Sequence, residues 1–253
     1  MSKYKIGITE AGDAGLDLTW EAKLPFVDGT ILITKNPRPQ FLTAVMRNQE
    51  KIILHITITG YGGTAIEPNV PIFIDTFHYL KDLVRAGFPQ NKIVIRVDPI
   101  IPTDKGIQKA FDMMAGSIDE GFTRFRVSII DMYPHVRERF IASRLPLPYG
   151  DKGFLPSISQ SKAVDKMLKS LNEYAKEKDH QIRIETCAEP RLKNAIQQGC
   201  ISSYDLNLLG LAEDADNDNV GFQRKNCLCY FGKTELLANK ERCPHQCLYC
   251  YWK

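Results

Sequence analysis

The stretch Lys51-Ile-Ile-Leu-His-Ile-Thr-Ile-Thr59 decides how this chain folds, because its side chains alternate between two chemical kinds. Successive side chains of a β-strand point to opposite faces of the sheet. Leu54 and Ile56 therefore share one face, while His55 and Thr57 share the other. We expect helices to cover the apolar face and the polar face to turn toward an enclosed space.

The same alternation recurs in three later stretches, 92–98, 124–131 and 181–187. Several charged residues fall on the polar face, namely Arg96, Asp98, Arg126, Arg183 and Glu185. A buried charge costs free energy unless a partner or a ligand offsets its desolvation. The pattern therefore predicts a polar cavity that holds a polar cofactor, and the alternative is an open sheet with one wet face. The residues expected in the cavity wall are Thr57, Thr59, Arg96 and Asp98.

Eight short strand-like stretches alternate with helical patterns along the chain. The expected strands are 4–9, 30–35, 51–59, 92–98, 124–131, 181–187, 205–209 and 234–238. Apolar residues recur every three to four positions in 71–85 and 161–176, which indicates helices there. Alternating strands and helices imply a parallel sheet. We predict an α/β fold, a (β/α) barrel or partial barrel with parallel strands, formed by residues 1–253 as a single domain.

The composition is that of an ordinary globular protein, with 253 residues, 43% hydrophobic and 25% charged. A net charge of +3 is too small to argue for a nucleic-acid partner, although a local basic groove could still exist. The start of the chain has no apolar signal core, and no apolar run reaches about eighteen residues. We therefore expect a cytoplasmic protein without a membrane partner, in which the seven cysteines are metal ligands and not disulfides.

Three of these cysteines stand close together in Cys243-Pro-His-Gln-Cys247-Leu-Tyr-Cys250. Three thiolates on one loop can hold three irons of a [4Fe-4S] cluster and leave the fourth iron open. The alternative is a structural zinc site, which needs four ligands and would recruit His245 or another residue. The two interpretations differ in whether one metal atom lacks a protein ligand and is therefore free to bind a cofactor or substrate.

The other four cysteines are Cys187, Cys200, Cys227 and Cys229. Four is the number that completes a second four-ligand site, so 187–232 is a candidate region for an auxiliary [4Fe-4S] cluster. A zinc site and four unrelated buried thiols are the alternatives.

The terminal motif resembles the Cys-x-x-x-Cys-x-x-Cys motif of the radical SAM superfamily, and Cys247-Leu-Tyr-Cys250-Tyr looks like its cysteine-x-aromatic-cysteine form. The resemblance implies that the open iron binds S-adenosylmethionine, with Tyr249 among the cofactor-binding residues. It also implies that an electron from a donor such as flavodoxin or ferredoxin splits this cofactor into a 5′-deoxyadenosyl radical. The radical would then take a hydrogen atom from a substrate that the sequence does not identify.

Further motifs resemble enzymes of the spore photoproduct lyase kind, namely Thr57-Ile-Thr59, Ile66-Glu-Pro68 and Arg96-Val-Asp-Pro-Ile-Ile-Pro102. The chain is more similar to a bacterial family that carries radical SAM-like cysteines at its carboxyl end. This resemblance implies a circularly permuted barrel, in which 233–253 forms the last strand and the cluster loop. It leaves two alternatives open: a nucleic-acid base-modifying or lesion-repair enzyme, and a non-catalytic zinc or iron-sulfur protein with a structural or redox-sensing role.

Overall fold

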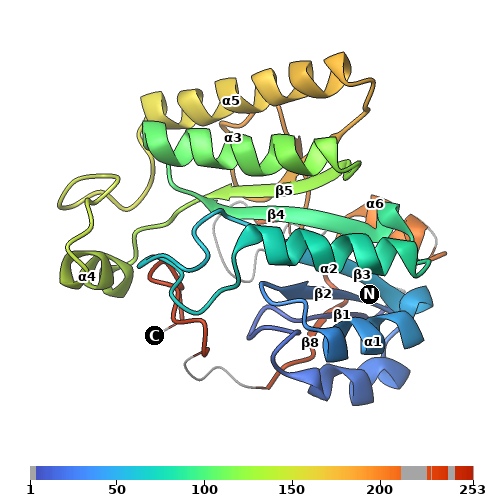
Figure 1. The fold of residues 1–253 in the computed structure, drawn as a ribbon. Coiled ribbons are helices and arrows are strands. Elements are labelled where there is room, and N and C mark those ends of the chain that lie inside the picture. The colour runs from blue at the N-terminus through green and yellow to red at the C-terminus, as the bar shows by residue number, and fades with distance from the viewer. Residues whose placement is uncertain (1–3, 212–226, 229, 239–242, 253) are drawn as a thin grey trace.

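The computed structural model describes residues 4–211, 227–228, 230–238 and 243–252. Eight strands form one sheet in the order β7-β6-β5-β4-β3-β2-β1-β8, and every neighbouring pair is parallel (Figure 1). The strands are β1 (Ile6–Ile8), β2 (Gly29–Thr34), β3 (Ile52–Thr57), β4 (Ile93–Ile100), β5 (Arg124–Ile129), β6 (Arg183–Thr186), β7 (Ile196–Gln197) and β8 (Lys233–Glu235). The predicted parallel α/β fold is confirmed.

Helices follow most of the strands, as alternating patterns predict. The α-helices are α1 (Pro39–Arg47), α2 (Phe73–Arg85), α3 (Asp104–Asp119), α4 (Pro134–Ala142), α5 (Ile158–Glu177) and α6 (Ser203–Leu208). Three 3-10 helices are η1 (Leu18–Phe26), η2 (Gln49–Lys51) and η3 (Gln90–Lys92). Local sequence sets several of their starts. Ser157 and Gln160 form a capping box before α5, and Pro134 occupies the first turn of α4, where a missing N–H costs nothing.

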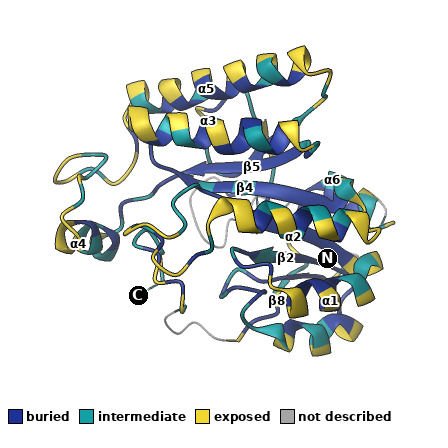
Figure 2. Ribbon diagram, viewed as in Figure 1, coloured by how far each residue is buried: buried dark blue, intermediate teal, exposed yellow. Residues whose placement is uncertain are grey.

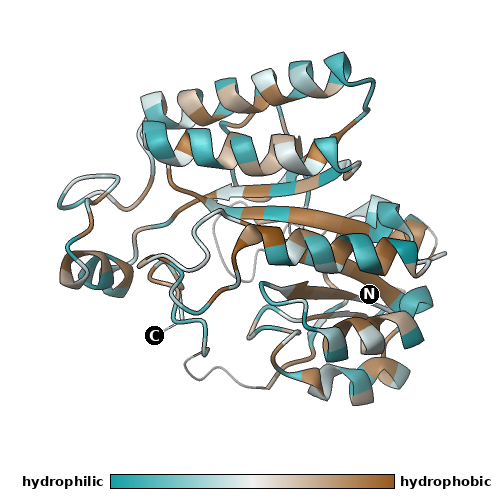
Figure 3. Cartoon of the chain, in the orientation of Figure 1, coloured by the Kyte–Doolittle hydropathy of each residue, from teal (hydrophilic) through white to brown (hydrophobic). Residues whose placement is uncertain are grey.

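The outer face of the sheet packs against the helices. Leu54, Ile56 and Val97 are almost fully buried in one large apolar core with residues of α1, α2, α3 and α5. Figure 2 shows that the strands are buried while the helices expose their outer sides, and Figure 3 shows the apolar character of the strands. The alternation of side chains in the strands therefore assigns the outer face correctly.

The inner face changes character along the strands. At the amino ends it is apolar, because Ile53 and Val94 pack with Leu206 of α6 and with Tyr230 in a separate core. Toward the carboxyl ends it carries charged and hydroxyl side chains. The inner face is thus less uniformly polar than the sequence pattern predicts, and only its carboxyl half borders an open space.

The predicted strand at 205–209 is wrong, because 205–208 belongs to helix α6 and Leu209 caps that helix. The reason is local. Ser202 accepts a hydrogen bond from the Asp205 N–H, and the Asp205 side chain accepts one from the Ser202 N–H, which together form a capping box. The short strand β7, in contrast, was not predicted, since its two residues carry no alternating pattern.

Strand β8 lies beside β1, with Ile6 opposite Lys233 and Ile8 opposite Glu235. Gly7 permits this close approach, because a Cβ there would lie 2.6 Å from the Leu236 side chain. The strand nearest the end of the chain therefore neighbours the first one. The consequence for the site is that residues 243–252 reach the carboxyl edge of the sheet.

Within the described residues, none of the helices has the length and apolar character needed to cross a membrane.

Candidate functional site: a cavity closed by the terminal cysteine loop

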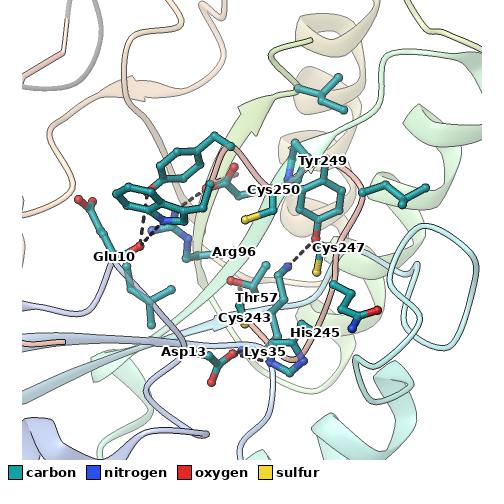
Figure 4. Close-up of a pocket in the computed structure, with 18 of the residues that line it drawn as sticks. Glu10, Asp13, Lys35, Thr57, Arg96, Cys243, His245, Cys247, Tyr249 and Cys250 are labelled. Carbon is teal, nitrogen blue, oxygen red and sulfur yellow. Dashed lines mark hydrogen bonds and ion pairs between the residues drawn. The ribbon is translucent and has the colours of Figure 1, made fainter. Parts of the chain in front are cut away.

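A cavity of about 670 Å³ lies at the carboxyl ends of strands β1 to β5, where parallel α/β proteins place their functional residues (Figure 4). Its size falls in the range of cofactor and small-molecule sites. The strands and their following loops contribute Thr9, Glu10, Asp13, Lys35, Thr57, Arg96, Asp98, Ser128 and Asp131. The terminal loop closes the cavity with Cys243, His245, Gln246, Cys247, Leu248, Tyr249, Cys250, Tyr251 and Trp252.

All three terminal cysteines line this cavity. The loop that carries them is tightly turned: the Gln246 N–H donates to the Cys243 carbonyl at 3.1 Å, and the Cys250 N–H donates to the Cys247 carbonyl at 3.2 Å. All three are free thiols, with Cys247 buried and the other two partly exposed. The loop thus presents three sulfur atoms to one enclosed space.

His245 is held by hydrogen bonds on both ring nitrogens. Its Nε2 lies 2.8 Å from Oδ2 of Asp13, and its Nδ1 lies 3.1 Å from the carbonyl oxygen of Asn69. Both ring nitrogens are therefore occupied, and the ring is only 3% exposed. Burial opposes the charge on Asp13, yet the hydrogen bond and charge of His245 hold the pKa of that carboxyl below its usual value. The zinc alternative needs His245 or another residue as a fourth ligand, and His245 would have to give up one of these two contacts to serve as one.

A buried polar network fixes the middle of the terminal loop. Lys35 donates to the Tyr249 hydroxyl at 2.7 Å and to Oε1 of Glu67 at 3.0 Å. The Tyr249 hydroxyl also donates to Glu67, and Thr59 donates to Oε2 of Glu67 at 2.6 Å. Of the expected wall residues, Thr57, Arg96, Asp98 and Tyr249 line the cavity, whereas Thr59 supports the wall through Glu67.

The opposite wall offers hydrogen-bond donors to a ligand. Arg96 donates through Nη2 to Asp98, and Ser128 donates to the same carboxylate. The Nη1 of Arg96 is buried and has no hydrogen-bond partner within the described part of the chain. Other atoms of the Arg96 side chain border the cavity, which this residue lines.

Two of the terminal thiols, Cys243 and Cys247, are shifted toward the protonated form. Burial raises the pKa of the Cys247 thiol to about 12, although the nearby charge of Lys35 opposes the rise. Burial likewise raises the pKa of Cys243. A metal would have to displace these protons, since metals bind the thiolate. In the parts of the chain that the structure describes, no three His, Cys, Asp or Glu side chains are arranged to hold a metal ion.

The second set of cysteines meets at the border of the same cavity. The sulfur atoms of Cys187 and Cys227 are 3.5 Å apart, and Cys200 lines the cavity. Hydrogen bonds from Cys200 and Cys227 lower the pKa of Cys187 well below its usual value, while Cys200 shows the opposite shift. Cys229, the fourth predicted member, lies outside the described residues.

The charges on the inner face largely pair with each other. Glu185 binds Nη2 of Arg126 at 2.7 Å and Nε of Arg183 at 2.6 Å. Arg124 binds Asp205 of helix α6 at 2.6 Å. Of the two means by which a buried charge can be offset, a partner or a ligand, these charges use partners that the protein itself provides.

Sequence reasoning missed Asp13, Asn69 and Arg139 in the site. Asp13 follows β1 at the carboxyl edge, so its position relative to that strand was a usable signal. Arg139 comes from helix α4 and had no such signal.

The fold and the site define a parallel α/β protein with a cysteine-lined cavity at the carboxyl edge of its sheet. The family described as DUF1848, a domain of unknown function, matches residues 19–252. The chain therefore belongs to this family. Among curated proteins, none matches the chain.

Proposed function

We propose that this protein is a radical SAM enzyme whose [4Fe-4S] cluster is held by Cys243, Cys247 and Cys250. The observation that carries the proposal is that these three cysteines, spaced as in that superfamily, line a cavity of about 670 Å³. The cavity lies at the carboxyl edge of a parallel sheet, and the adjacent β8 neighbours β1. When bound, the cluster would supply the electron that cleaves S-adenosylmethionine to a radical.

The residues of the wall suit a polar cofactor. Arg96, Thr57 and Asp98 line one wall of the cavity, and their polar side chains suit the carboxylate and ribose oxygens of such a cofactor. The rings of Tyr251 and Trp252, whose centroids lie 4.9 Å apart, also line the cavity. Tyr249 is held by Lys35 and Glu67, so its ring stays at the wall.

The donor set fits a cluster better than a structural zinc ion. His245 is occupied on both nitrogens, so the loop offers three sulfur ligands and no fourth one of its own. Three thiolates and an open iron are the requirement of the proposed chemistry. The non-catalytic alternative with structural zinc would need a fourth ligand from outside the loop.

We also propose that the second set of cysteines binds metal. Sulfurs that share one tetrahedral zinc ion lie about 3.8 Å apart when each bond is about 2.3 Å. The 3.5 Å between Cys187 and Cys227 is close to that value, which favours a single ion there over the auxiliary cluster. A metal count on the Cys187→Ser variant tests this proposal, because zinc should be lost while iron stays.

The two candidate substrate classes are a nucleic-acid base and a smaller molecule. A net charge of +3 gives nucleic acid no support. DNA or RNA binding that weakens steeply with salt would favour the repair or base-modification alternative.

The test of the main proposal is to measure iron, sulfide and zinc per chain after anaerobic reconstitution, followed by electron paramagnetic resonance with and without S-adenosylmethionine. We expect about four irons at the terminal site and a spectrum that the cofactor perturbs. The Cys247→Ala variant should lose both the iron and the formation of 5′-deoxyadenosine. Zinc at the terminal site, or a spectrum indifferent to S-adenosylmethionine, would overturn the proposal.

A further inference from the structure

Helix α4 lies next to the terminal cysteine loop although it belongs to the excursion between β5 and α5 (Figure 1). Val136 and Phe140 of this helix are buried in a small apolar core, and Leu248 and Tyr249 of the loop pack against that core. The excursion thus forms part of the surface on which the loop rests.

Arg139 of the same helix binds the end of the loop with both terminal nitrogens. Its Nη1 donates to the carbonyl oxygen of Cys250 at 2.7 Å, and its Nη2 donates to that of Trp252 at 2.8 Å. Hydrogen bonds from a charged donor are stronger than neutral ones, and the planar fork of a guanidinium fixes two acceptors at once. Arg139 therefore sets the position of Cys250 relative to the cavity.

The positive charge of Arg139 would also affect the reduction potential of a cluster bound by the loop. The Arg139 side chain also lines the cavity. A positive charge beside a cluster ligand stabilises the reduced cluster, which carries one more negative charge than the oxidised one. Its loss should therefore move the reduction potential to a more negative value.

We infer that Arg139 is a positioning residue, which fixes Cys250 and Trp252 through two carbonyl hydrogen bonds and raises the reduction potential of the cluster held by that loop. The positioning of Cys250 and Trp252 by Arg139 concerns the protein without metal. The effect of Arg139 on the reduction potential rests on the proposed function.

Three variants separate geometry from charge. Arg139→Gln removes the fork and the charge, while Arg139→Lys keeps the charge but cannot span both carbonyls in a fixed geometry. Arg137→Gln is the matched control, because Arg137 lies on the same helix and donates to the Gly153 carbonyl at 2.6 Å instead of to the loop. Thermal unfolding of each variant checks that the fold is kept.

The first measurement uses metal-free protein and acrylamide quenching of tryptophan fluorescence. Trp20 is fully buried, so the quenchable emission comes from Trp252. We expect quenching to increase in Arg139→Gln and Arg139→Lys and to stay at the wild-type level in Arg137→Gln. Unchanged quenching in Arg139→Gln would overturn the positioning role.

The second measurement uses reconstituted protein and a spectroscopic redox titration. We expect a more negative midpoint potential in Arg139→Gln than in the wild type and in Arg139→Lys. Equal potentials for the two Arg139 variants would overturn the role of charge. If the wild type takes up no iron, the proposed function fails along with that role, whereas the quenching result on metal-free protein still decides the positioning role.

Discussion

The pair of Lys35 and Glu67 offers a quantitative test of how the terminal loop is held. Replacing Glu67 with Gln keeps the shape of the side chain but removes the negative charge that lies 3.0 Å from Lys35. Glu67 is 1% exposed and the Lys35 side chain 16%, so the pair is largely removed from bulk water. Breaking one partner of a buried ion pair costs about 3–5 kcal/mol, a large share of the roughly 5–15 kcal/mol that stabilises a domain.

The assay is urea unfolding of metal-free protein, which gives the free energy of unfolding without any contribution from a cofactor. We expect Glu67→Gln to lower it by about 3 kcal/mol or more. Glu173→Gln is the control, because Glu173 lies 3.8 Å from Lys169 on the exposed side of α5 and its loss should cost at most about 1 kcal/mol.

A double variant with Lys35→Met adds a direct check. Removing both charges leaves no unpaired buried ion, so Lys35→Met with Glu67→Gln should be more stable than Glu67→Gln alone. A loss below about 1 kcal/mol for Glu67→Gln would refute the reasoning, since it would mean that Lys35 reaches water when Glu67 is neutral.

Two further predictions concern acid and the histidine of the loop. The charge of Lys35 and hydrogen bonds from Thr59 and Tyr249 outweigh burial and lower the pKa of Glu67. The ionised Glu67 carboxylate therefore stabilises the fold fully above its unfolded-state pKa of about 4.3. This stabilisation is lost as pH falls through the folded-state pKa. The gap in unfolding free energy between wild type and Glu67→Gln should therefore shrink between about pH 5 and pH 3, and a constant gap would contradict this assignment. His245→Gln should keep the iron content of the reconstituted protein but lower its stability by about 1–3 kcal/mol, and loss of iron would show that His245 is a ligand after all.

The strands and their faces could be predicted from the sequence because strand alternation is a local property. Leu54 and Ile56 lie in the outer core and Thr57 faces the cavity, as their two-residue period indicates. The segment 205–209 was predicted wrongly because its apolar residues fit a strand or a helix equally well, and the capping box of Ser202 decided for the helix.

The partners of the site residues could not be predicted, because they come from distant parts of the chain. His245 and Asp13 are 232 positions apart, and Arg139 and Cys250 are 111 positions apart. No spacing rule relates such residues before the strands are ordered.

The sequence by itself determined which residues can form strands, which side chains share a face and which cysteines stand close enough to act together. These properties depend on backbone geometry over a few residues, so they are readable from local patterns. Only the tertiary structure decided that β8 lies beside β1, that Lys35 and Glu67 hold Tyr249, and that Arg139 holds the loop end. These contacts follow from the packing of the whole sheet and its helices, since burial makes each polar group take whichever partner the fold brings within reach.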